Sequence, residues 1–533
     1  MKKLLISTLI FSIFLSIAMG QVKPRRFSKQ WKMDGPEKSW NTVEHESFFQ
    51  WRDKLRARRA MTNDEILRRQ KAILNGNKIT TEIWNYGSIS SPGNRVTDIV
   101  WEGLGYGYEF GPFIGAEIII PANSHQDAYI KKDSSGNPIL DADGNPIWAA
   151  KVISDGLVSL GGEISPDGKS FWGWEPLTYN EKGVPYGDPN SPRIPTSNDM
   201  DRDGDGKPDS WPEGWYNANL KRYVWPGALR QGSSNADLES FFVVDDRSNQ
   251  EFKYYPFSND STKMGLGIEI ECRYYQWSNP LAEDVIFLIY KVTNKSEKDL
   301  NEVVFGMWGD PHIGGPSNWQ DDLSYFDTEL NMVYAWDEDG KSDVAGRKPG
   351  YFGYIFLESP GDPHDGKDND GDGLIDESRE NGIDDDGDWN PDKDDVGIDG
   401  LPNTGDTGEN DGVPTAGDAF DIRQPGEPNF EWTDLDESDM IGLTSFSAPN
   451  FGGNNRISKD DYIYSTYMNP GQFDSLNADV AGDNIFLYGS GRFTLKAGEA
   501  RRFSIALLVG DGYDDLTLNA KTARQIYDTN YQF

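Results

Sequence analysis

The sequence predicts a mainly β protein: an antiparallel β-sandwich with long insertions, a helical N-terminal arm and a short C-terminal helix. Three observations support this class. Apolar residues alternate in successive segments from residue 81 onward, glycine and proline turns separate those segments, and helical spacing is confined to the two ends of the chain. Strands that follow one another through such turns are typical of β-sandwiches.

Residues 1–20 have the form of a secretory signal peptide. Two lysines precede an apolar run over residues 4–18, and small residues end the run. This order is that of a signal peptide and not of a membrane span. The single cysteine, Cys272, lies far from the cleavage position, so no lipid anchor is expected there. The sequence therefore predicts a secreted or cell-surface protein that is not a lipoprotein and has no transmembrane segment.

Residues 21–80 form a basic N-terminal arm. They hold 15 Lys or Arg against 7 Asp or Glu, a net charge of +8. Thr62 and Glu65 have capping-box spacing, and the apolar residues that follow recur at helical spacing up to Leu74. The pattern predicts a helix over residues 63–74 that packs on the body through its apolar face. Binding to an anionic surface is the alternative.

The body of the predicted sandwich, residues 81–360, contains the clearest strand patterns. Residues 265–277 alternate so that Cys272 falls on the apolar face, which predicts a core residue and not a nucleophile. Residues 284–294 are apolar on both faces and predict a central strand. Residues 103–111 have an aromatic face and a face of mostly glycine, which predicts a strand lying close against another backbone.

The sandwich is expected to return over residues 431–533. Residues 492–510 predict two strands joined by a turn, and residues 515–527 predict a helix that closes the fold. Residues 361–430 interrupt the strands as an acidic insertion. An insertion at a loop tip is tolerated because the two ends of the loop stay close together.

The charge of the chain is strongly negative and uneven. The whole sequence carries a formal net charge of -37, and residues 362–421 hold 21 Asp or Glu against 3 Lys or Arg, a net of -18. Phosphate backbones are bound by Lys and Arg, so this charge argues against nucleic acid as a partner. Cations are the natural counterpart of so many carboxylates.

Aspartates recur two residues apart in a pattern typical of calcium loops. The order D-x-D-x-D-G-x-x-D occupies residues 201–209 and 368–376, and a glutamate follows twelve residues after the first aspartate of each copy. Alternate side chains of a tightly coiled loop converge on one point, glycine permits the turn, and Ca²⁺ takes six to eight oxygens. A third, imperfect copy has Trp389 in place of the glycine. The predicted calcium ligands are Asp201, Asp203, Asp205, Asp209, Glu213, Asp368, Asp370, Asp372, Asp376, Glu380, Asp384, Asp386, Asp388 and Asp392.

These loops resemble the calcium loops of thrombospondin type 3 repeats and of dockerins, which lack the full helix-loop-helix of an EF-hand. A wider resemblance is carried by DVIFLIYKVTN at residues 284–294 and RFTLKAGEARRFSIALLVG at residues 492–510. It is to large uncharacterised secreted proteins of environmental Gram-negative bacteria, in which fibronectin type III modules and a type IX sorting domain often follow. The resemblance implies an extracellular protein and brings no established activity with it.

The sequence contains no clear catalytic constellation. Its four histidines lack zinc-site spacing, and no G-x-S-x-G is present. The best cluster is WGDPHIGG at residues 308–315, where Asp310 and His312 flank a proline. The expected role of this cluster is a structural turn in which Asp310 caps backbone amides or binds an ion. The tryptophans, Trp172 and Trp174 among them, are expected mainly to fill the interior and not to stack on sugars.

Two functions remain open at the level of sequence. The favoured one is a secreted or cell-surface calcium-binding protein with a structural or adhesive role and without catalytic activity. The alternative is a carbohydrate-active protein, either a glycan-binding module or a glycoside hydrolase. Calcium is the predicted cofactor, and a cell-surface glycan or another extracellular protein is the predicted partner. Exposed aromatics beside two facing carboxylates would favour the alternative.

Overall fold

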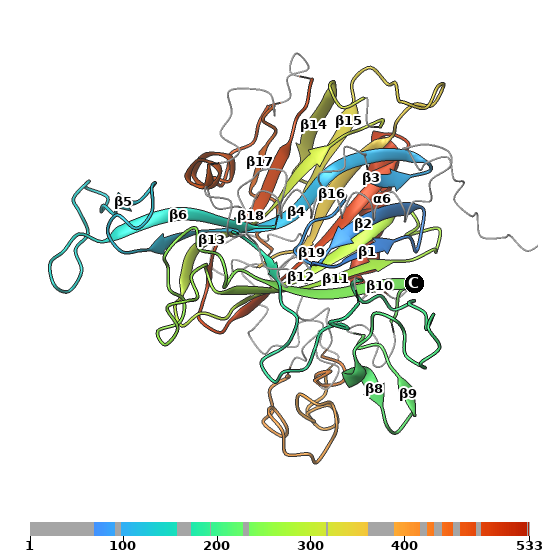
Figure 1. Cartoon of the computed structure of the whole chain (residues 1–533), viewed down its shortest axis with the longest axis horizontal. Helices are drawn as coiled ribbons and strands as arrows, with labels where there is room; N and C mark the ends of the chain where they lie inside the picture. The colour runs from blue at the N-terminus through green and yellow to red at the C-terminus, as the bar shows by residue number, and fades with distance from the viewer. Residues whose placement is uncertain are drawn as a thin grey trace, which may run out of the picture.

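Two antiparallel sheets face each other across one large apolar core (Figure 1). The computed structural model describes residues 69–90, 98–156, 172–191, 193–227, 234–315, 318–360, 389–415, 424–430, 440–450, 459–475, 481–529 and 531. The predicted mainly β, antiparallel sandwich is confirmed.

The first sheet has nine strands. Its order is β1-β2-β3-β4-β13-β18-β17, with β6 paired to β4 and β5 paired to β6. Its strands are β1 (Lys71–Leu74), β2 (Ile79–Trp84), β3 (Asp98–Trp101), β4 (Leu104–Ile119), β5 (Tyr129–Ile130), β6 (Trp148–Asp155), β13 (Leu300–Pro311), β17 (Ser445–Ser447) and β18 (Phe486–Leu495). Strands β5 and β6 extend with the end of β4 to one side of the body (Figure 1).

The second sheet has eight strands in the order β14-β15-β16-β19-β12-β11-β10-β7. Its strands are β7 (Glu175–Pro176), β10 (Leu238–Asp245), β11 (Ile268–Gln276), β12 (Val285–Asn294), β14 (Asp322–Asp327), β15 (Met332–Asp337), β16 (Tyr351–Glu358) and β19 (Ala500–Gly510). A separate ribbon joins β8 (Tyr216–Asn217) to β9 (Arg222–Tyr223). Among the described residues, the helical segments are η2 (Glu213–Trp215), α5 (Asp460–Tyr462), η3 (Ile463–Tyr467) and α6 (Tyr513–Asp528).

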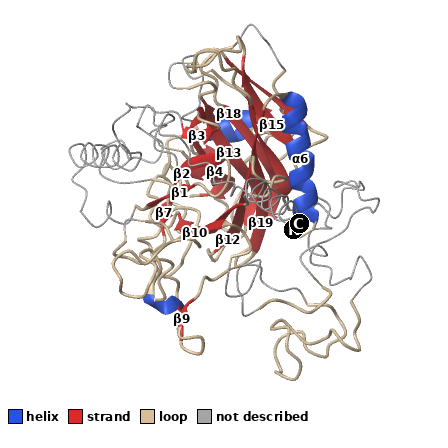
Figure 2. Ribbon diagram, turned by 90° about the vertical axis from the view of Figure 1, so that its right-hand side faces the viewer, coloured by secondary structure: helices blue, strands red, loops and turns tan. Residues whose placement is uncertain are grey.

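Strand β12 is buried on both faces, as its sequence predicts. Ile286 and Leu288 point into the core between the sheets. Phe287 and Ile289 point the other way, into a second cluster that includes Leu516 of α6. Figure 2 shows α6 lying along the outer side of the sheets, so the predicted C-terminal helix is confirmed and covers one sheet.

The other predicted strands are also confirmed. Cys272 in β11 is fully buried in the core between the sheets. The glycine-rich aromatic strand is the first half of β4, and its neighbour β13 also contributes glycines. Gly306 and Gly309 of β13 lie directly opposite Phe113 and Phe110 of β4, whose rings occupy the space that a side chain would need. The close approach is therefore partly between backbone and aromatic rings, and not only between two backbones.

The predicted helix over residues 63–74 is wrong at its C-terminal end. Residues 71–74 form β1, in which Ala72 and Leu74 are buried and Lys71 and Ile73 are half-buried. This period of two suits a strand, and pairing with β2 overrides the helical spacing of the apolar residues. The remainder of the predicted helix, and residues 21–68 as a whole, lie outside the described residues. The body therefore includes residues that the sequence assigned to the arm.

The described helices include none with the length and apolar run that crossing a bilayer requires.

Shortening a side chain of the central strand should destabilise the whole sandwich. Leu288 is 1% exposed, so Leu288→Ala leaves a cavity between the sheets and should lower the free energy of unfolding by about 2–5 kcal/mol. Urea unfolding monitored by tryptophan fluorescence measures the change. Leu518→Ala, on the exposed face of α6, is the control and should stay within about 0.5 kcal/mol of the wild type. Equal losses in both variants would contradict this arrangement of the core.

Candidate metal centre

The first predicted calcium loop, residues 199–213, is carried by the outer edge of the eight-stranded sheet. The chain before the loop runs beside β10, where the Ser197 N–H donates to the carbonyl of Glu239 at 2.8 Å. The chain after it continues into η2 and the β8–β9 ribbon, which lies below β10 in Figure 1. Both ends of the loop are therefore attached to regular structure.

A cluster of tryptophans supports the loop from beneath. Trp211 and Trp225 are buried against Phe241 and Val243, on the face of β10 that points away from the main core. The Trp211 and Trp225 ring centroids are 5.5 Å apart, and Trp211 Nε1 donates to the carbonyl of Thr196 at 2.9 Å. These rings fill an interior, as the sequence predicts for most of its tryptophans. Trp174 is likewise fully buried.

Three of the predicted ligands converge within the loop. Each of Asp201, Asp203 and Asp209 offers a carboxylate oxygen that lies within 4.8 Å of the other two. Asp201 accepts hydrogen bonds from Gly204 N at 2.6 Å and from Gly206 N at 2.9 Å, which closes the loop around its first carboxylate. Both glycines have positive φ, +84° and +92°, a conformation that glycine adopts without strain. The glycine at the sixth position therefore has the role that the sequence suggests.

The two other predicted ligands of this loop point elsewhere. Asp205 Oδ1 accepts a hydrogen bond from the backbone N–H of Lys207 at 2.8 Å. Glu213 Oε2 accepts a hydrogen bond from the Tyr223 hydroxyl at 2.7 Å, and the Glu213 side chain is 81% exposed. The structure thus brings together three of the five residues predicted here and leaves Asp205 and Glu213 outside the group.

Arg202 adds a charge that the sequence analysis did not use. Its Nη1 lies 2.7 Å from both Asp199 Oδ1 and Asp209 Oδ2. Backbone and side-chain hydrogen bonds from Arg202 lower the pKa of Asp209. Burial raises the pKa of Asp199, but hydrogen bonds from Ser210 and Arg202 outweigh burial and leave that pKa below its usual value. Asp199 lies two residues before Asp201 and so continues the spacing of the aspartates. That spacing could have identified Asp199 as a further carboxylate of this loop.

The second and third predicted loops lie mostly outside the described residues. This applies to Asp368, Asp370, Asp372, Asp376, Glu380, Asp384, Asp386 and Asp388. Asp392 is described and is exposed at the surface. Trp389, which replaces the glycine of the third copy, donates from Nε1 to Glu427 Oε2 at 2.9 Å.

In the described half of the acidic insertion, carboxylates serve as acceptors for backbone N–H groups. The Glu427 carboxylate accepts from Gly397 N at 2.8 Å and from Thr415 N at 3.2 Å, and Asp406 accepts from Asp399 N at 2.7 Å. Burial raises the pKa of Glu427 in spite of these hydrogen bonds. Part of the acidic charge therefore accepts backbone hydrogen bonds that close loops.

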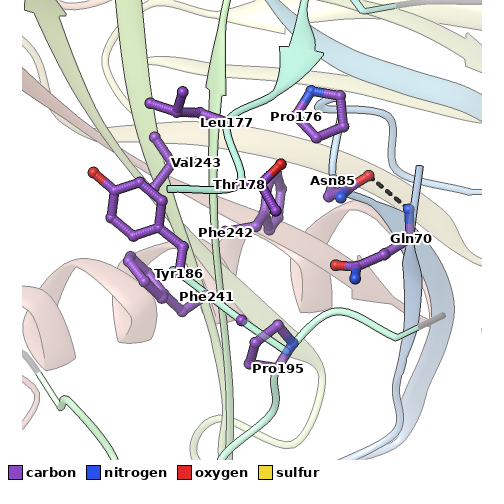
Figure 3. A pocket seen from close by; sticks show the side chains of 11 residues that line it. Gln70, Asn85, Pro176, Leu177, Thr178, Tyr186, Pro195, Phe241, Phe242 and Val243 are labelled. Carbon is purple, nitrogen blue, oxygen red and sulfur yellow. Dashed lines mark hydrogen bonds between the residues drawn. The ribbon is translucent and has the colours of Figure 1, made fainter. Parts of the chain in front are cut away.

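A shallow pocket lies beside β7 and β10, far along the chain from the acidic insertion. Figure 3 shows its mainly apolar lining and the hydrogen bond from Gln70 N to Asn85 Oδ1, which measures 2.8 Å. The described lining residues are Gln70, Asn85, Pro176, Leu177, Thr178, Tyr186, Gly187, Pro195, Phe241, Phe242 and Val243. None of them is a carboxylate, so this pocket lacks the facing acids that a glycoside hydrolase uses.

A row of half-buried aromatic side chains lies on the face of the eight-stranded sheet that carries α6. Trp336 of β15 and Tyr351 of β16 have ring centroids 5.6 Å apart and an angle of 7° between their planes. Tyr334 lies 5.6 Å from Trp336 and 5.1 Å from Tyr513, which is 36% exposed. Aromatic faces of this kind can stack on sugars as well as on each other.

Comparison with known proteins gives no family for this chain. No protein-family model matches it, and no curated protein matches it. Among solved structures, a polysaccharide lyase matches at 11% sequence identity and a TM-score of 0.19, covering 52% of this chain and 26% of the lyase chain. A likeness of that size does not establish a shared fold or a shared activity.

Proposed function

We propose that this protein is a secreted or cell-surface β-sandwich protein whose inserted loops bind calcium and whose role is structural or adhesive, without catalysis. The rigid part of such a protein is the two-sheet core. The loops at its edges supply the surface that meets other molecules, because loops carried by a rigid scaffold are the usual place for binding. Calcium would hold those loops in one shape. Another extracellular protein or a glycan is the partner that such a surface would meet.

One observation carries the calcium proposal: Asp201, Asp203 and Asp209 direct carboxylate oxygens to a common point on an exposed loop. The three oxygens supply part of the six to eight that Ca²⁺ takes, and water and backbone carbonyls commonly supply the remainder. All three donors are oxygen, which suits a hard cation. The supporting tryptophan cluster fixes the loop on the sheet, so an ion bound there would be held in a defined place.

Removing a central ligand should remove one calcium equivalent. Asp203→Ala deletes a carboxylate of the group, so calorimetric titration of the variant should show one fewer bound Ca²⁺ than the wild-type chain. Titration after treatment with a chelator gives the starting state. The loss of this one calcium equivalent should not change calcium binding by the second acidic loop, because separate sites contribute additively.

The matched control is Asp133→Ala. Asp133 and Asp203 each accept a hydrogen bond from the backbone N–H two residues ahead, at 2.9 Å and 3.1 Å. Both substitutions therefore remove the same kind of turn contact, but only Asp203 belongs to the carboxylate group. Unchanged stoichiometry in Asp203→Ala, or an equal loss in Asp133→Ala, would count against the calcium proposal.

The tryptophan cluster should affect calcium affinity without supplying a ligand. Trp211→Ala removes a ring that is 7% exposed and its hydrogen bond to Thr196, which loosens the base of the loop. We expect weaker calcium binding with unchanged stoichiometry, and faster proteolytic cleavage within residues 199–215. The control position is Tyr216, an exposed residue of β8, the strand that follows the loop. If Tyr216→Ala and Trp211→Ala behave alike, the supporting role is refuted.

Glycan binding is the second candidate function, because the aromatic row of β15 and β16 favours it. Tyr334, Trp336, Tyr351 and Tyr513 gather on one face, and all four are partly exposed. Asp327 of β14 reaches the same row, since its Oδ2 accepts a hydrogen bond from the Tyr513 hydroxyl at 2.9 Å, and its carboxylate could also accept from a sugar hydroxyl.

A glycan panel tests this second candidate. If it is correct, the wild-type chain binds at least one glycan, and Trp336→Ala binds that glycan roughly tenfold more weakly, since losing one aromatic contact costs about 1.5 kcal/mol. Calorimetry measures both affinities. Tyr216→Ala, which removes an exposed ring elsewhere, should bind the glycan as the wild type does. Absence of binding across the panel would reject the glycan function and leave the calcium proposal intact.

A further inference from the structure

A second group of possible metal ligands lies at the end of β13, far from the calcium loop. Asp310 and His312 come from the WGDPHIGG segment, and Asp483 comes from the chain just before β18. One ligand atom from each of the three side chains lies within 4.8 Å of the other two. His312 Nε2 is 3.3 Å from Asp310 Oδ1 and 4.0 Å from Asp483 Oδ1.

The backbone holds these residues in place. The His312 N–H donates to the carbonyl of Tyr106 at 3.1 Å. Asp322, at the start of β14, joins the two chain segments. Its Oδ2 accepts from Ile313 N at 2.9 Å, and its carbonyl accepts from Gly482 N at 3.1 Å and from Asn484 Nδ2 at 2.9 Å. The two segments that carry the ligands, one at the end of β13 and one before β18, are therefore both held by hydrogen bonds to the first residue of β14.

Two carboxylate oxygens of the group have no hydrogen-bond partner among the described residues. These are Asp310 Oδ1 and Asp483 Oδ1, the same atoms that face His312 Nε2. The Asp310 side chain is only 8% exposed, so its unpaired oxygen has little access to solvent. A buried carboxylate oxygen without a partner costs free energy, and such atoms point to an ion that completes their coordination.

The arrangement of charge agrees with this interpretation. Two carboxylates share this partly buried space, and the described part of the chain places no lysine or arginine in ion-pair contact with either of them. A divalent cation would neutralise both.

The histidine ring is held in an orientation suitable for a metal. It stacks on Tyr108 at 5.1 Å and on Trp319 at 5.7 Å between ring centroids. With Nε2 facing the carboxylates, the ring can contribute its nitrogen without a change of position. Two ligand atoms of a tetrahedral zinc ion, each about 2.0 Å from the metal, are separated by about 3.3 Å, which matches the distance from His312 Nε2 to Asp310 Oδ1.

We propose that Asp310, His312 and Asp483 form a site for a divalent first-row transition metal ion, of which zinc is the reference case. Imidazole suits zinc and its neighbours in the first row, whereas sites of oxygen alone suit calcium and magnesium. Three protein ligands would leave a coordination position of the metal for water. The site differs in chemistry from the calcium loops and does not depend on them.

A third acidic group shows why the histidine cluster is preferred. Asp321, Asp337 and Asp339 also bring carboxylate oxygens within 4.8 Å of one another. In that group Lys341 Nζ forms an ion pair with Asp339, and Asn318 Nδ2 donates to Asp337 Oδ2 at 2.5 Å. A lysine and an amide already contact two of the three carboxylates, and the group has no nitrogen ligand, so it carries no transition-metal proposal.

Cobalt titration of the full chain tests the site. Excess calcium is present throughout to occupy the acidic loops, and Co²⁺ binding is followed by visible absorption, with Zn²⁺ as the competitor. The wild-type chain should bind one Co²⁺ equivalent that zinc displaces. His312→Gln and Asp483→Asn should each weaken this binding by at least the 10–100-fold that loss of an outer-shell partner typically causes.

The two substitutions and one control keep the result interpretable. Asp483→Asn preserves side-chain volume at a position that is 23% exposed, so it should fold even if His312→Gln does not. His125→Gln is the control, because His125 is half-buried on the segment between β4 and β5 and lies outside the cluster. Equal cobalt affinity in the wild type and Asp483→Asn, or an equal loss in His125→Gln, would overturn the proposal. Calcium binding at Asp203 is a separate measurement, so either proposal can fail without the other.

Discussion

The structure depends on the burial of the central strands of the eight-stranded sheet on both faces. In β12, even-numbered residues from Ile286 to Val292 pack against the opposite sheet, and Val285, Phe287 and Ile289 pack beneath α6. A strand that is apolar on both sides must be covered on both sides, which places the nine-stranded sheet on one face and the C-terminal helix on the other. As a result, α6, near the end of the sequence, packs on β12, near its middle. Strand β19 has the same property and lies between β12 and β16.

Negative charge is the second constraint, and the described residues meet it in different ways. Asp141 and Asp133 use their carboxylates to accept backbone N–H groups in exposed turns, and Glu427 does the same within the acidic insertion. Other carboxylates pair with cationic side chains, as Glu239 pairs with Arg273 at 2.6 Å in a fully buried position. The two candidate metal groups differ in this respect. Asp209 of the Asp201 group is paired with Arg202, whereas Asp310 Oδ1 and Asp483 Oδ1 have no hydrogen-bond partner among the described residues.

Much of the fold could be predicted from the sequence, because the periodicity of β11, β12 and α6 records the environment of each residue directly. The first strand could not. Ile73 and Leu74 fit a helical spacing equally well, and only pairing with β2 decides between the two. The candidate calcium loop was predictable because its ligands lie close together in the sequence. The same two-residue spacing also extends to Asp199. Asp483 was not, since it lies 171 residues after His312 and only the neighbouring positions of β13 and β18 bring the two together.

The two kinds of candidate metal site differ in the way that their surroundings would select an ion. The Asp201 group lies on a loop whose carboxylates are partly exposed, where a hard cation can keep water and backbone oxygens in a flexible coordination shell. The Asp310 group lies where β13 ends and β18 begins, in a place where backbone hydrogen bonds fix the ligands and a nitrogen donor takes part. A small ion with few ligands gains from such fixed geometry, whereas calcium, with its larger and variable shell, gains less. Rigidity and donor type therefore favour different ions at the two places, even though aspartate supplies most of the charge at both.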